Sequence, residues 1–373
     1  MTIANEWWVK RREELEILAR DKSPVRIYID EILNEVLFDF LYIDAVERIF
    51  YKAGTNPHPR ILEKVNRMGA GFKCVSTCEI VHLLEMFPDI TPGQFLFAPD
   101  FAGPEDYDYA FEKDISVVLN DVYPIKAWPN VFREKEIFLQ VLWPKQETAG
   151  PGIPASKIED ASKTLNDVEA KVKGLQLESK EIDLFAPGRL METVSFLADL
   201  ASSLEGISFF SLGNEIGLSG RQSTGTRSIK GIGQELEEVR DAYPRFRLWL
   251  TPGPAVFSDA GIILTKVTEV IEREGRTYVR MDMDMEMLLQ QVIYGRHPDI
   301  LNLSKLNKTA SMPAHVIGAA SRIDDSICYV TRLAAVEEGD ILLITNTGIS
   351  SLPLVEPINE HYLNARKMCP VNI

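Results

Sequence analysis

The chain has 373 residues, of which 45% are hydrophobic and 25% charged, and its formal net charge is −15 at pH 7. This composition is typical of a globular protein long enough for two domains, or for one barrel with an appendage. Such an acidic surface repels a phosphate backbone and so excludes nucleic acid as a partner. The four cysteines are too few and too scattered for a disulfide framework, and no histidine pair accompanies them, so we expect no metal site.

The N-terminus lacks the apolar core of a signal peptide, and nowhere do about 18 apolar residues follow one another. We therefore expect a cytoplasmic protein that makes no contact with a membrane. The first predicted element is an amphipathic helix over Glu6–Arg20.

From about residue 46 the chain alternates short apolar runs with segments of helical period. The predicted strands are Val46–Lys52, Phe72–Thr77, Phe95–Pro99, Ile115–Asp121, Glu136–Trp143, Lys173–Ser179, Ile207–Gly213 and Phe246–Leu250. A helix is predicted between each successive pair, the first over Pro59–Ala70. Eight such parallel units predict an α/β fold, a (β/α)8 TIM-type barrel. A doubly wound sheet is the alternative, but the first strand lacks a glycine-rich turn after it.

After Pro254 the pattern changes to strands joined by tight turns. The predicted strands are Gly261–Ile271, Thr277–Asp284, Ala314–Ala319, Ile327–Leu333 and Asp340–Thr345. The chain is thus predicted to have a helical segment over residues 1–23, a barrel over 24–254 and an all-β domain over 255–373. Asp282, Asp284 and Glu286 alternate along one of these strands. An exposed strand face is favoured there over calcium binding.

Several short segments match one enzyme class in order and spacing. They are Phe50-Tyr51 with Asn56–Pro59, then Gly71–Ile80, Phe97–Ala102, Ser156-Lys157, Pro252-Gly253, Val292–Gly295 and Val336–Asp340. In these segments the chain resembles the fold-type III pyridoxal-phosphate enzymes, and among them most closely the diaminopimelate decarboxylases. The resemblance implies an alanine racemase-like barrel followed by a β domain. It also implies a dimer whose active sites form across a two-fold interface, and a lysine that binds pyridoxal phosphate (PLP).

The candidate lysine is Lys52, but an ungapped alignment with the family places the cofactor-binding lysine on Gly54. In a strand Lys52 would share a face with residue 54, displaced by roughly 6–7 Å along the barrel. Lys52 therefore has two interpretations. It could bind the cofactor in a rebuilt site, or it could be a structural residue that pairs with Glu178 or Glu215. The structural interpretation is favoured.

Other family motifs are also altered. Glu178–Glu181 stands where the family has His-x-Gly-Ser, and Thr251–Pro254 stands where it has Glu-Pro-Gly-Arg. Ser321-Arg322 stands where the family has a cysteine–acid pair, which a partner subunit supplies to the active site. Gln290-Gln291 stands where the family has Arg-Pro. The glycine-rich phosphate loop is reduced to Gly213-Asn214-Glu215, in which Glu215 would repel a phosphate dianion. The resemblance leaves Gly213, Asn214 and Tyr362 as the residues that could contact the cofactor.

One polar loop follows the seventh strand, at the barrel face where active sites lie. Arg221, Arg227 and Lys230 in this loop could bind an anion, although a solvated loop is favoured. The losses in several separate motifs lead us to expect a non-catalytic relative of diaminopimelate decarboxylase. It would dimerise with itself or with an active paralogue. The alternative is an active PLP-dependent amino-acid decarboxylase that uses Lys52.

Overall fold

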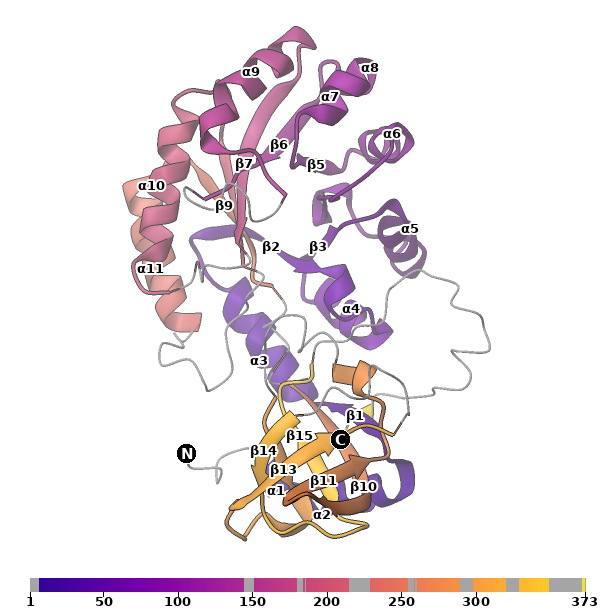
Figure 1. The fold of residues 1–373 in the computed structure, drawn as a ribbon. Coiled ribbons are helices and arrows are strands. Elements are labelled where there is room, and N and C mark those ends of the chain that lie inside the picture. The colour runs from indigo at the N-terminus through magenta and orange to yellow at the C-terminus, as the bar shows by residue number, and fades with distance from the viewer. Residues whose placement is uncertain are drawn as a thin grey trace. The chain divides into compact units, whose positions relative to one another are not determined.

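The computed structural model describes residues 7–143, 151–179, 184, 186–214, 229–253, 258, 260–288, 298–319, 329–348 and 371–372 (Figure 1). Across these residues no helix is both long enough and apolar enough to cross a membrane.

The centre of the fold is a closed barrel of eight parallel strands, β2 to β9 (Figure 1). These are β2 (Val46–Lys52), β3 (Gly71–Cys74), β4 (Phe95–Phe97), β5 (Ser116–Leu119), β6 (Glu136–Gln140), β7 (Lys171–Ser179), β8 (Phe209–Asn214) and β9 (Arg247–Thr251). The barrel closes because β9 pairs with β2, where Ile49 lies opposite Leu250. All eight strands lie where the sequence predicts them, so the TIM-type barrel is confirmed.

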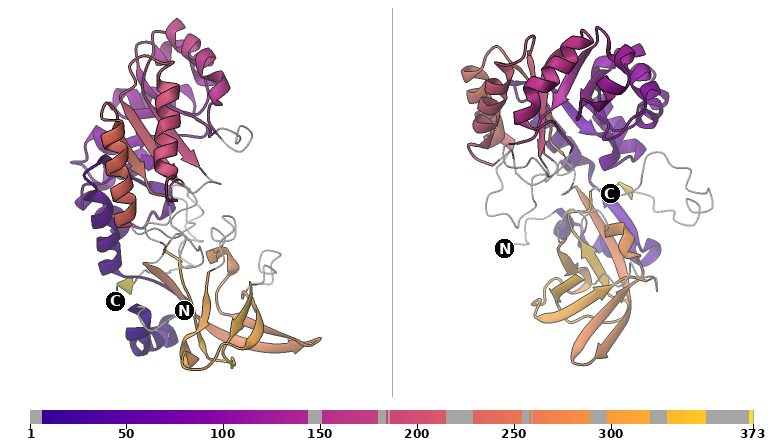
Figure 2. Two further views of the ribbon diagram at one scale, coloured as in Figure 1. Left: turned by 90° about the vertical axis from the view of Figure 1, so that its left-hand side faces the viewer. Right: turned by 45° about the horizontal axis from the view of Figure 1, so that its top comes forward.

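Helices connect these strands and lie around the barrel (Figure 2). They are α4 (Pro59–Arg67), α5 (Thr77–Met86), α6 (Pro104–Glu112), α7 (Tyr123–Ala127), α8 (Pro129–Phe132), α9 (Ile158–Asp167), α10 (Arg189–Ala201) and α11 (Ile229–Ala242), with 3₁₀ turns η3 (Pro92–Gln94) and η4 (Ala155–Lys157). His58 is the N-cap of α4 and accepts a hydrogen bond from the Arg60 N–H at 3.3 Å. The helix therefore begins at Pro59, as the sequence predicts.

Aromatic rings fill the barrel interior on one level. Phe50, Phe138, Phe209 and Trp249 come from four different strands, and the rings of Phe138 and Trp249 stack with centroids 4.9 Å apart. Gly174 makes room for this layer, because a Cβ atom there would lie 2.5 Å from the ring of Phe138. The barrel is thus a packed core, as is general for this fold.

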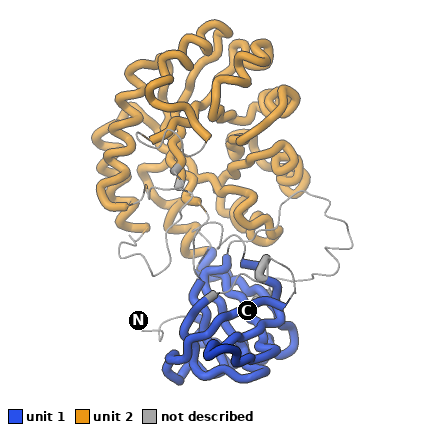
Figure 3. The backbone as a smooth tube through the Cα atoms, in the orientation of Figure 1, with its two compact units in different colours: residues 1–33, 257–351, 357–373 blue, residues 34–256, 352–356 orange. Residues whose placement is uncertain are grey.

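The chain divides into two compact units (Figure 3). One comprises residues 34–256 and 352–356 and holds the barrel, whereas the other comprises residues 1–33, 257–351 and 357–373. The division differs from the prediction over residues 24–33, which belong with the sheet. The reason is β1 (Val25–Tyr28), which pairs antiparallel with β10 (Gly261–Arg273).

The second unit is built on a mixed eight-stranded sheet. Besides β1 and β10 it contains β11 (Arg276–Met281), β12 (Ile300–Asn302), β13 (Met312–Ile317), β14 (Tyr329–Leu333), β15 (Ile341–Ile344) and β16 (Val371–Asn372), with η6 (Met285–Leu288) and η7 (Leu303–Lys305). The predicted N-terminal helix forms as α1 (Trp7–Lys10) and α2 (Arg12–Lys22), and Trp8 and Leu15 pack against this sheet. Helix α3 (Asp30–Leu41), which was not predicted, leads into the barrel.

A small charged cluster ties η7 to the turn before β15. Asp340 forms an ion pair with Lys305 at 2.9 Å, and it accepts hydrogen bonds from the Asn302 side chain at 2.9 Å and from the Glu337 N–H. Burial by itself raises the pKa of Asp340, but the hydrogen bonds from Lys305 and Asn302 outweigh it and lower the pKa below its usual 3.8. The ionised carboxylate therefore stabilises the fold.

We predict that Asp340→Asn lowers the free energy of unfolding at pH 7 by about 1–2 kcal/mol, because the charge-assisted hydrogen bonds are lost. A carboxyl with a depressed pKa contributes stability above its unfolded value of 3.8 and loses it as the pH falls through the folded value. The difference from wild type should hence shrink below pH 4 in urea unfolding followed by circular dichroism. A difference that stays constant from pH 3 to pH 7 would contradict this role.

Candidate functional site

Inside the barrel, an ion pair joins two strands that lie apart in the sheet. The Nζ atom of Lys73 on β3 donates to Oε2 of Glu178 on β7, and the side chains are only 3% and 8% exposed. Lys73 is the polar residue in a four-residue strand that is buried throughout. A charge taken out of water is costly unless it is paired, so each side chain depends on the other.

A layer of buried polar side chains occupies the barrel interior on β6, β7 and β8. Gln176 donates to the side chain of Gln140 at 3.0 Å and accepts from the Ser211 hydroxyl at 3.4 Å. Gln140 also donates to the Pro151 carbonyl at 2.7 Å. Glu178 follows Gln176 by two residues on β7 and so points to the same side of the strand, toward its carboxyl end. Toward the carboxyl ends of the strands, the side chains that fill the barrel therefore change from aromatic rings to amides and then to charged groups.

The surroundings of Glu178 are shaped to hold its side chain. In the sheet register Glu178 lies opposite Gly213, which lies opposite Thr251 on β9. A Cβ atom on Gly213 would lie 3.0 Å from Cγ of Glu178, so the glycine leaves the space that the glutamate fills. The hydroxyl of Thr251 is buried and has no hydrogen-bond partner among the described residues. Gly213 thus leaves room for the Glu178 side chain of the ion pair.

Lys52 ends β2, where it lies in register with Lys73 on the adjacent strand. The strand does not continue to Gly54, because Ala53–Thr55 forms a 3₁₀ turn. The assumption that residues 52 and 54 share one strand face is therefore wrong. Glu178, one of the two partners expected for Lys52, is paired with Lys73, which the sequence analysis did not single out, and Glu215 lies outside the described residues.

A second buried carboxylate lies beside this turn. Glu79 on α5 accepts a hydrogen bond from the Val75 N–H at 2.8 Å, and a Cβ atom on Gly54 would lie 3.1 Å from its Oε1. Burial raises the pKa of Glu79, although the Val75 hydrogen bond and the positive charge of Lys52 act in the opposite direction. The end of β2 thus brings a lysine and a largely desolvated carboxyl close to a glycine.

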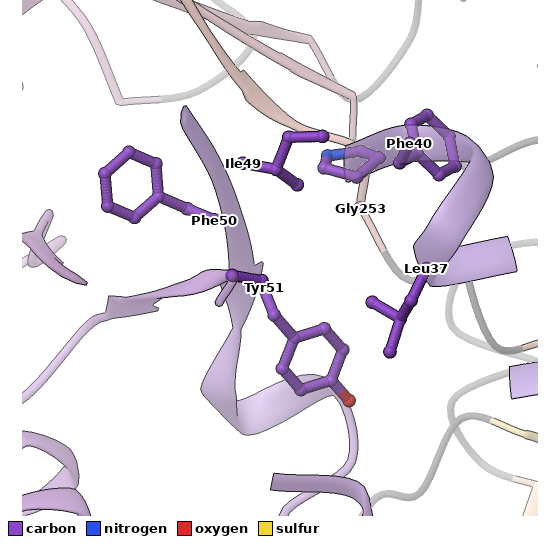
Figure 4. Close-up of a pocket in the computed structure, with 8 residues that line it drawn as sticks. Leu37, Phe40, Ile49, Phe50, Tyr51 and Gly253 are labelled. Atoms are coloured by element: carbon purple, nitrogen blue, oxygen red, sulfur yellow. The ribbon is translucent and has the colours of Figure 1, made fainter. Parts of the chain in front are cut away.

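The outer side of β2 faces a small apolar cavity instead of a site. Figure 4 shows Ile49 and Tyr51 on the side toward Leu37 and Phe40 of α3, and Phe50 on the opposite side. The cavity has an almost wholly apolar lining, so it offers packing space and no chemistry.

The other predicted site residues are only partly described. Lys230 is exposed in the first turn of α11, whereas Arg221, Arg227 and Tyr362 lie outside the described residues, as does the side chain of Asn214. The expected anion loop therefore stays a prediction. Among the described residues there is no group of His, Cys, Asp and Glu that could hold a metal ion. Asp282 instead accepts hydrogen bonds from Ser23, Thr265 and the Lys266 N–H.

Comparison with known families identifies the family to which this barrel and sheet belong. A model described as "Pyridoxal-dependent decarboxylase, C-terminal sheet domain" matches residues 40–348. The chain belongs to this family. Among curated relatives it is 23% identical over 340 residues to a diaminopimelate decarboxylase of Deinococcus radiodurans, covering 87% of this chain and 84% of the relative. A diaminopimelate decarboxylase of Thermoplasma acidophilum is 21% identical, covering 81% of this chain and 76% of the relative.

Solved structures of the family share the fold at low identity. A diaminopimelate decarboxylase structure superposes with a TM-score of 0.77 at 17% identity, covering 96% of this chain and 91% of that one. The arginine decarboxylase of Paramecium bursaria Chlorella virus gives 0.75 at 14% identity, covering 91% and 94%. The predicted resemblance to fold-type III PLP decarboxylases, closest to diaminopimelate decarboxylase, is thereby confirmed.

The described residues at the carboxyl end of the barrel do not fit the family's cofactor. Glu178 places a buried carboxylate, already paired with Lys73, in the segment where the resemblance expects the stacking histidine. The space above Gly213 is filled by that same glutamate. The end of β9 carries the small hydroxyl of Thr251 in place of the carboxylate that would hold the pyridine nitrogen. This donor set suits neither a phosphate dianion nor a protonated pyridine.

We predict that Lys73→Met destabilises the protein by about 3–5 kcal/mol, because it removes one charge of a buried ion pair and leaves the other in place. The double variant Lys73→Met/Glu178→Met should be much closer to wild type, since both charges are gone. Urea unfolding of wild type, both single variants and the double variant gives a double-mutant cycle, which measures the interaction energy between the two side chains.

An exposed pair provides the matched control for this cycle. Lys163 and Asp160 are 75% and 79% exposed and 3.2 Å apart on α9, so Lys163→Met should change the stability by less than about 1 kcal/mol. Equal effects of Lys73→Met and Lys163→Met would show that the buried pair is not a constraint.

We also predict a pH-dependent effect of Glu79→Gln. A carboxyl with a raised pKa lowers the stability as the pH rises from its unfolded value of 4.5 through the folded value. The stability of the variant relative to wild type should therefore increase across this pH window. The amide oxygen of the introduced glutamine can still accept the hydrogen bond from the Val75 N–H. Thermal unfolding from pH 4 to pH 7 measures it, with Glu85→Gln on the exposed side of α5 as control. A parallel response of the two variants would refute the prediction.

Proposed function

We propose that this protein is a non-catalytic relative of diaminopimelate decarboxylase that acts as a dimer partner. The observation that carries the proposal is the buried Lys73–Glu178 ion pair at the carboxyl end of the barrel. Active sites of TIM-type barrels lie at that end. Here it is filled by an internal pair of charges with its own supporting residues.

The energetics of this pair support the loss of cofactor binding. A phosphate group brought next to Glu178 would face a buried carboxylate, and moving Lys73 to the phosphate would break the buried ion pair. Breaking a buried pair costs about 3–5 kcal/mol before any gain from the new contact. In addition, Gly54 occupies the position at which an ungapped alignment puts the cofactor-binding lysine. Binding would thus require both a new lysine position and a rearranged interior.

A second candidate is an active PLP-dependent amino-acid decarboxylase that uses Lys52. It is supported by the place of Lys52 at the end of β2, close enough to influence Glu79. Glu79 is a buried carboxyl whose pKa is raised, a property that often marks functional sites. This reading requires Lys52 to react with the cofactor although Lys73 and Glu178 stay paired.

We predict that incubation with PLP gives no lysine-bound cofactor inside the barrel. Borohydride reduction followed by peptide mass spectrometry should find label only on exposed lysines, to equal extents in wild type and Lys52→Ala. The visible absorbance of the mixture should likewise not depend on Lys52. No carbon dioxide should be released from diaminopimelate, lysine, ornithine or arginine.

The diaminopimelate decarboxylase of Deinococcus radiodurans, treated in parallel, is the positive control. Stoichiometric label on Lys52, with an absorbance band that Lys52→Ala removes, would overturn the proposal in favour of the active enzyme. Label on Lys73 would also overturn it, because the ion pair would then have opened for the cofactor.

A further inference from the structure

One face of the sheet unit carries a row of arginines. Strands β10, β11, β13 and β14 are neighbours in the sheet, and alternate residues on them, such as Val279, pack into the buried core of this unit. The residues in between point to the opposite face. There Arg273 of β10 lies opposite Arg276 of β11, and Arg332 of β14 continues the same line across Pro313 of β13. We name the three arginine side chains the arginine row.

The arginine row brings like charges together. Glu274-Gly275 forms the two-residue turn between β10 and β11, with positive φ at both residues, so the hairpin holds Arg273 and Arg276 directly opposite each other. Like charges in such a pair destabilise a sheet. All three arginines are exposed, and within the described parts of the chain none of them forms an ion pair. A chain of net charge −15 thus keeps three cations in one row without a paired carboxylate.

An apolar and aromatic row lies parallel to the arginine row. The sheet register aligns its four side chains on successive strands, and we name them the apolar row: Ile271, Tyr278, His315 and Val330. The rings of Tyr278 and His315 stack with centroids 5.1 Å apart, and Val330 is 69% exposed. The two rows are two residues apart along the strands, or about 7 Å. The β10–β11 hairpin, which contributes to both rows, extends beyond the rest of this sheet (Figure 2, orange).

Positive charge on this face is confined to one side of the apolar row. On the other side Arg280 lies opposite Glu269, and the two form an ion pair at 3.6 Å. The face therefore presents an apolar row with unpaired arginines along one edge. Arginine and tyrosine beside apolar side chains are typical of protein interfaces.

We propose that the two rows form a docking site for an extended segment of another protein, in which acidic and apolar residues alternate. Successive side chains of an extended chain point to opposite sides. A segment that lies between the rows and crosses the strands therefore directs its carboxylates to the arginine row and its apolar side chains to the apolar row. Arginine suits the first contact, because its planar guanidinium binds a carboxylate through two parallel hydrogen bonds.

The size of the site sets the length and the affinity of the segment. Neighbouring strands lie about 4.8 Å apart, so each row is about 14 Å long, and roughly four or five extended residues span it. Such a contact is smaller than the roughly 800 Å² that each partner buries in a stable complex. Binding is therefore weak and reversible, with a dissociation constant of about 10–100 μM.

The charge of the whole chain favours a short acidic segment over a nucleic acid. At physiological ionic strength, charges more than about 8 Å away are largely screened, so a short segment responds mainly to the arginines that it touches. A nucleic acid carries a phosphate at every nucleotide and extends beyond the two rows, where it meets the other acidic residues of a chain of net charge −15. Bases stacked on Tyr278 and His315 are the competing mode of binding, which a nucleic-acid probe tests.

Fluorescence anisotropy with the purified full chain at about 0.15 M salt provides the test. The probe is a labelled peptide that alternates acidic and apolar residues, Asp-Phe-Glu-Leu-Asp-Phe-Glu, blocked at both ends. The control peptide has the same composition in two blocks, Asp-Glu-Asp-Glu-Phe-Leu-Phe. The alternating peptide should bind at least about 10-fold more tightly than the block peptide, because only the alternating one reaches both rows along its whole length. Labelled oligouridylate should not bind.

Variants on each row locate the contact. Both Arg273→Ala/Arg276→Ala and Val330→Asp should weaken binding of the alternating peptide at least about 10-fold. Arg20→Ala, at a 72% exposed arginine on α2 of the same unit, is the matched control and should bind like wild type. Circular dichroism establishes that each variant is folded, and Arg332→Ala, which lies outside the hairpin, tests the arginine row without changing the turn.

Three outcomes would overturn the inference. In the first, wild type does not bind the alternating peptide or binds both peptides equally. In the second, the folded arginine-row variants bind like wild type. In the third, oligouridylate binds more tightly than the peptide and loses its binding in Arg273→Ala/Arg276→Ala, which would assign the face to single-stranded nucleic acid. None of these results depends on the cofactor experiment, so this site and the proposed function are tested separately.

Discussion

The ion pair between Lys73 and Glu178 is the constraint around which the barrel interior is arranged. Each charge is buried, so neither can lose its partner without a cost of several kcal/mol. The glycine at 213 and the small threonine at 251 then follow, because a larger residue at 213 would displace the glutamate. Gln176, which is hydrogen-bonded to Gln140, lies two residues before Glu178 on the same strand. The residues that close this end therefore depend on one another.

The family fold is built by residues other than this ion pair. The aromatic layer, the strand register and the sheet unit are enough to build the barrel, and none of them needs a cofactor. A family fold can hence persist while the groups at its mouth change, since function resides in particular side chains and not in the fold. Stability comes from the packed core, and the surfaces remain free to acquire a role in assembly.

The sequence predicted the barrel well because its strands are short apolar runs at regular spacing, and β2 has the predicted bounds. It did not predict β1, since Val25–Tyr28 is short and its partner β10 lies far along the chain. Lys73 was missed for a related reason. A lysine within a strand is normally exposed, and only the closed sheet shows that this one points inward toward Glu178. Lys52 was placed correctly at the strand end, but the turn at Ala53–Thr55 could not be foreseen from strand periodicity.

The two lysines at this end of the barrel, Lys52 and Lys73, lie close to two carboxyl groups. Lys52 and Lys73 are register neighbours, so their ammonium groups would repel each other if no carboxylate were near. Glu178 neutralises Lys73, and Glu79 is close enough to Lys52 for its pKa to respond to that charge. The two lysines are thus accompanied by two carboxyl groups. A dianionic ligand gains little from such a set, because every lysine that attracts it is accompanied by a carboxyl group that repels it when ionised.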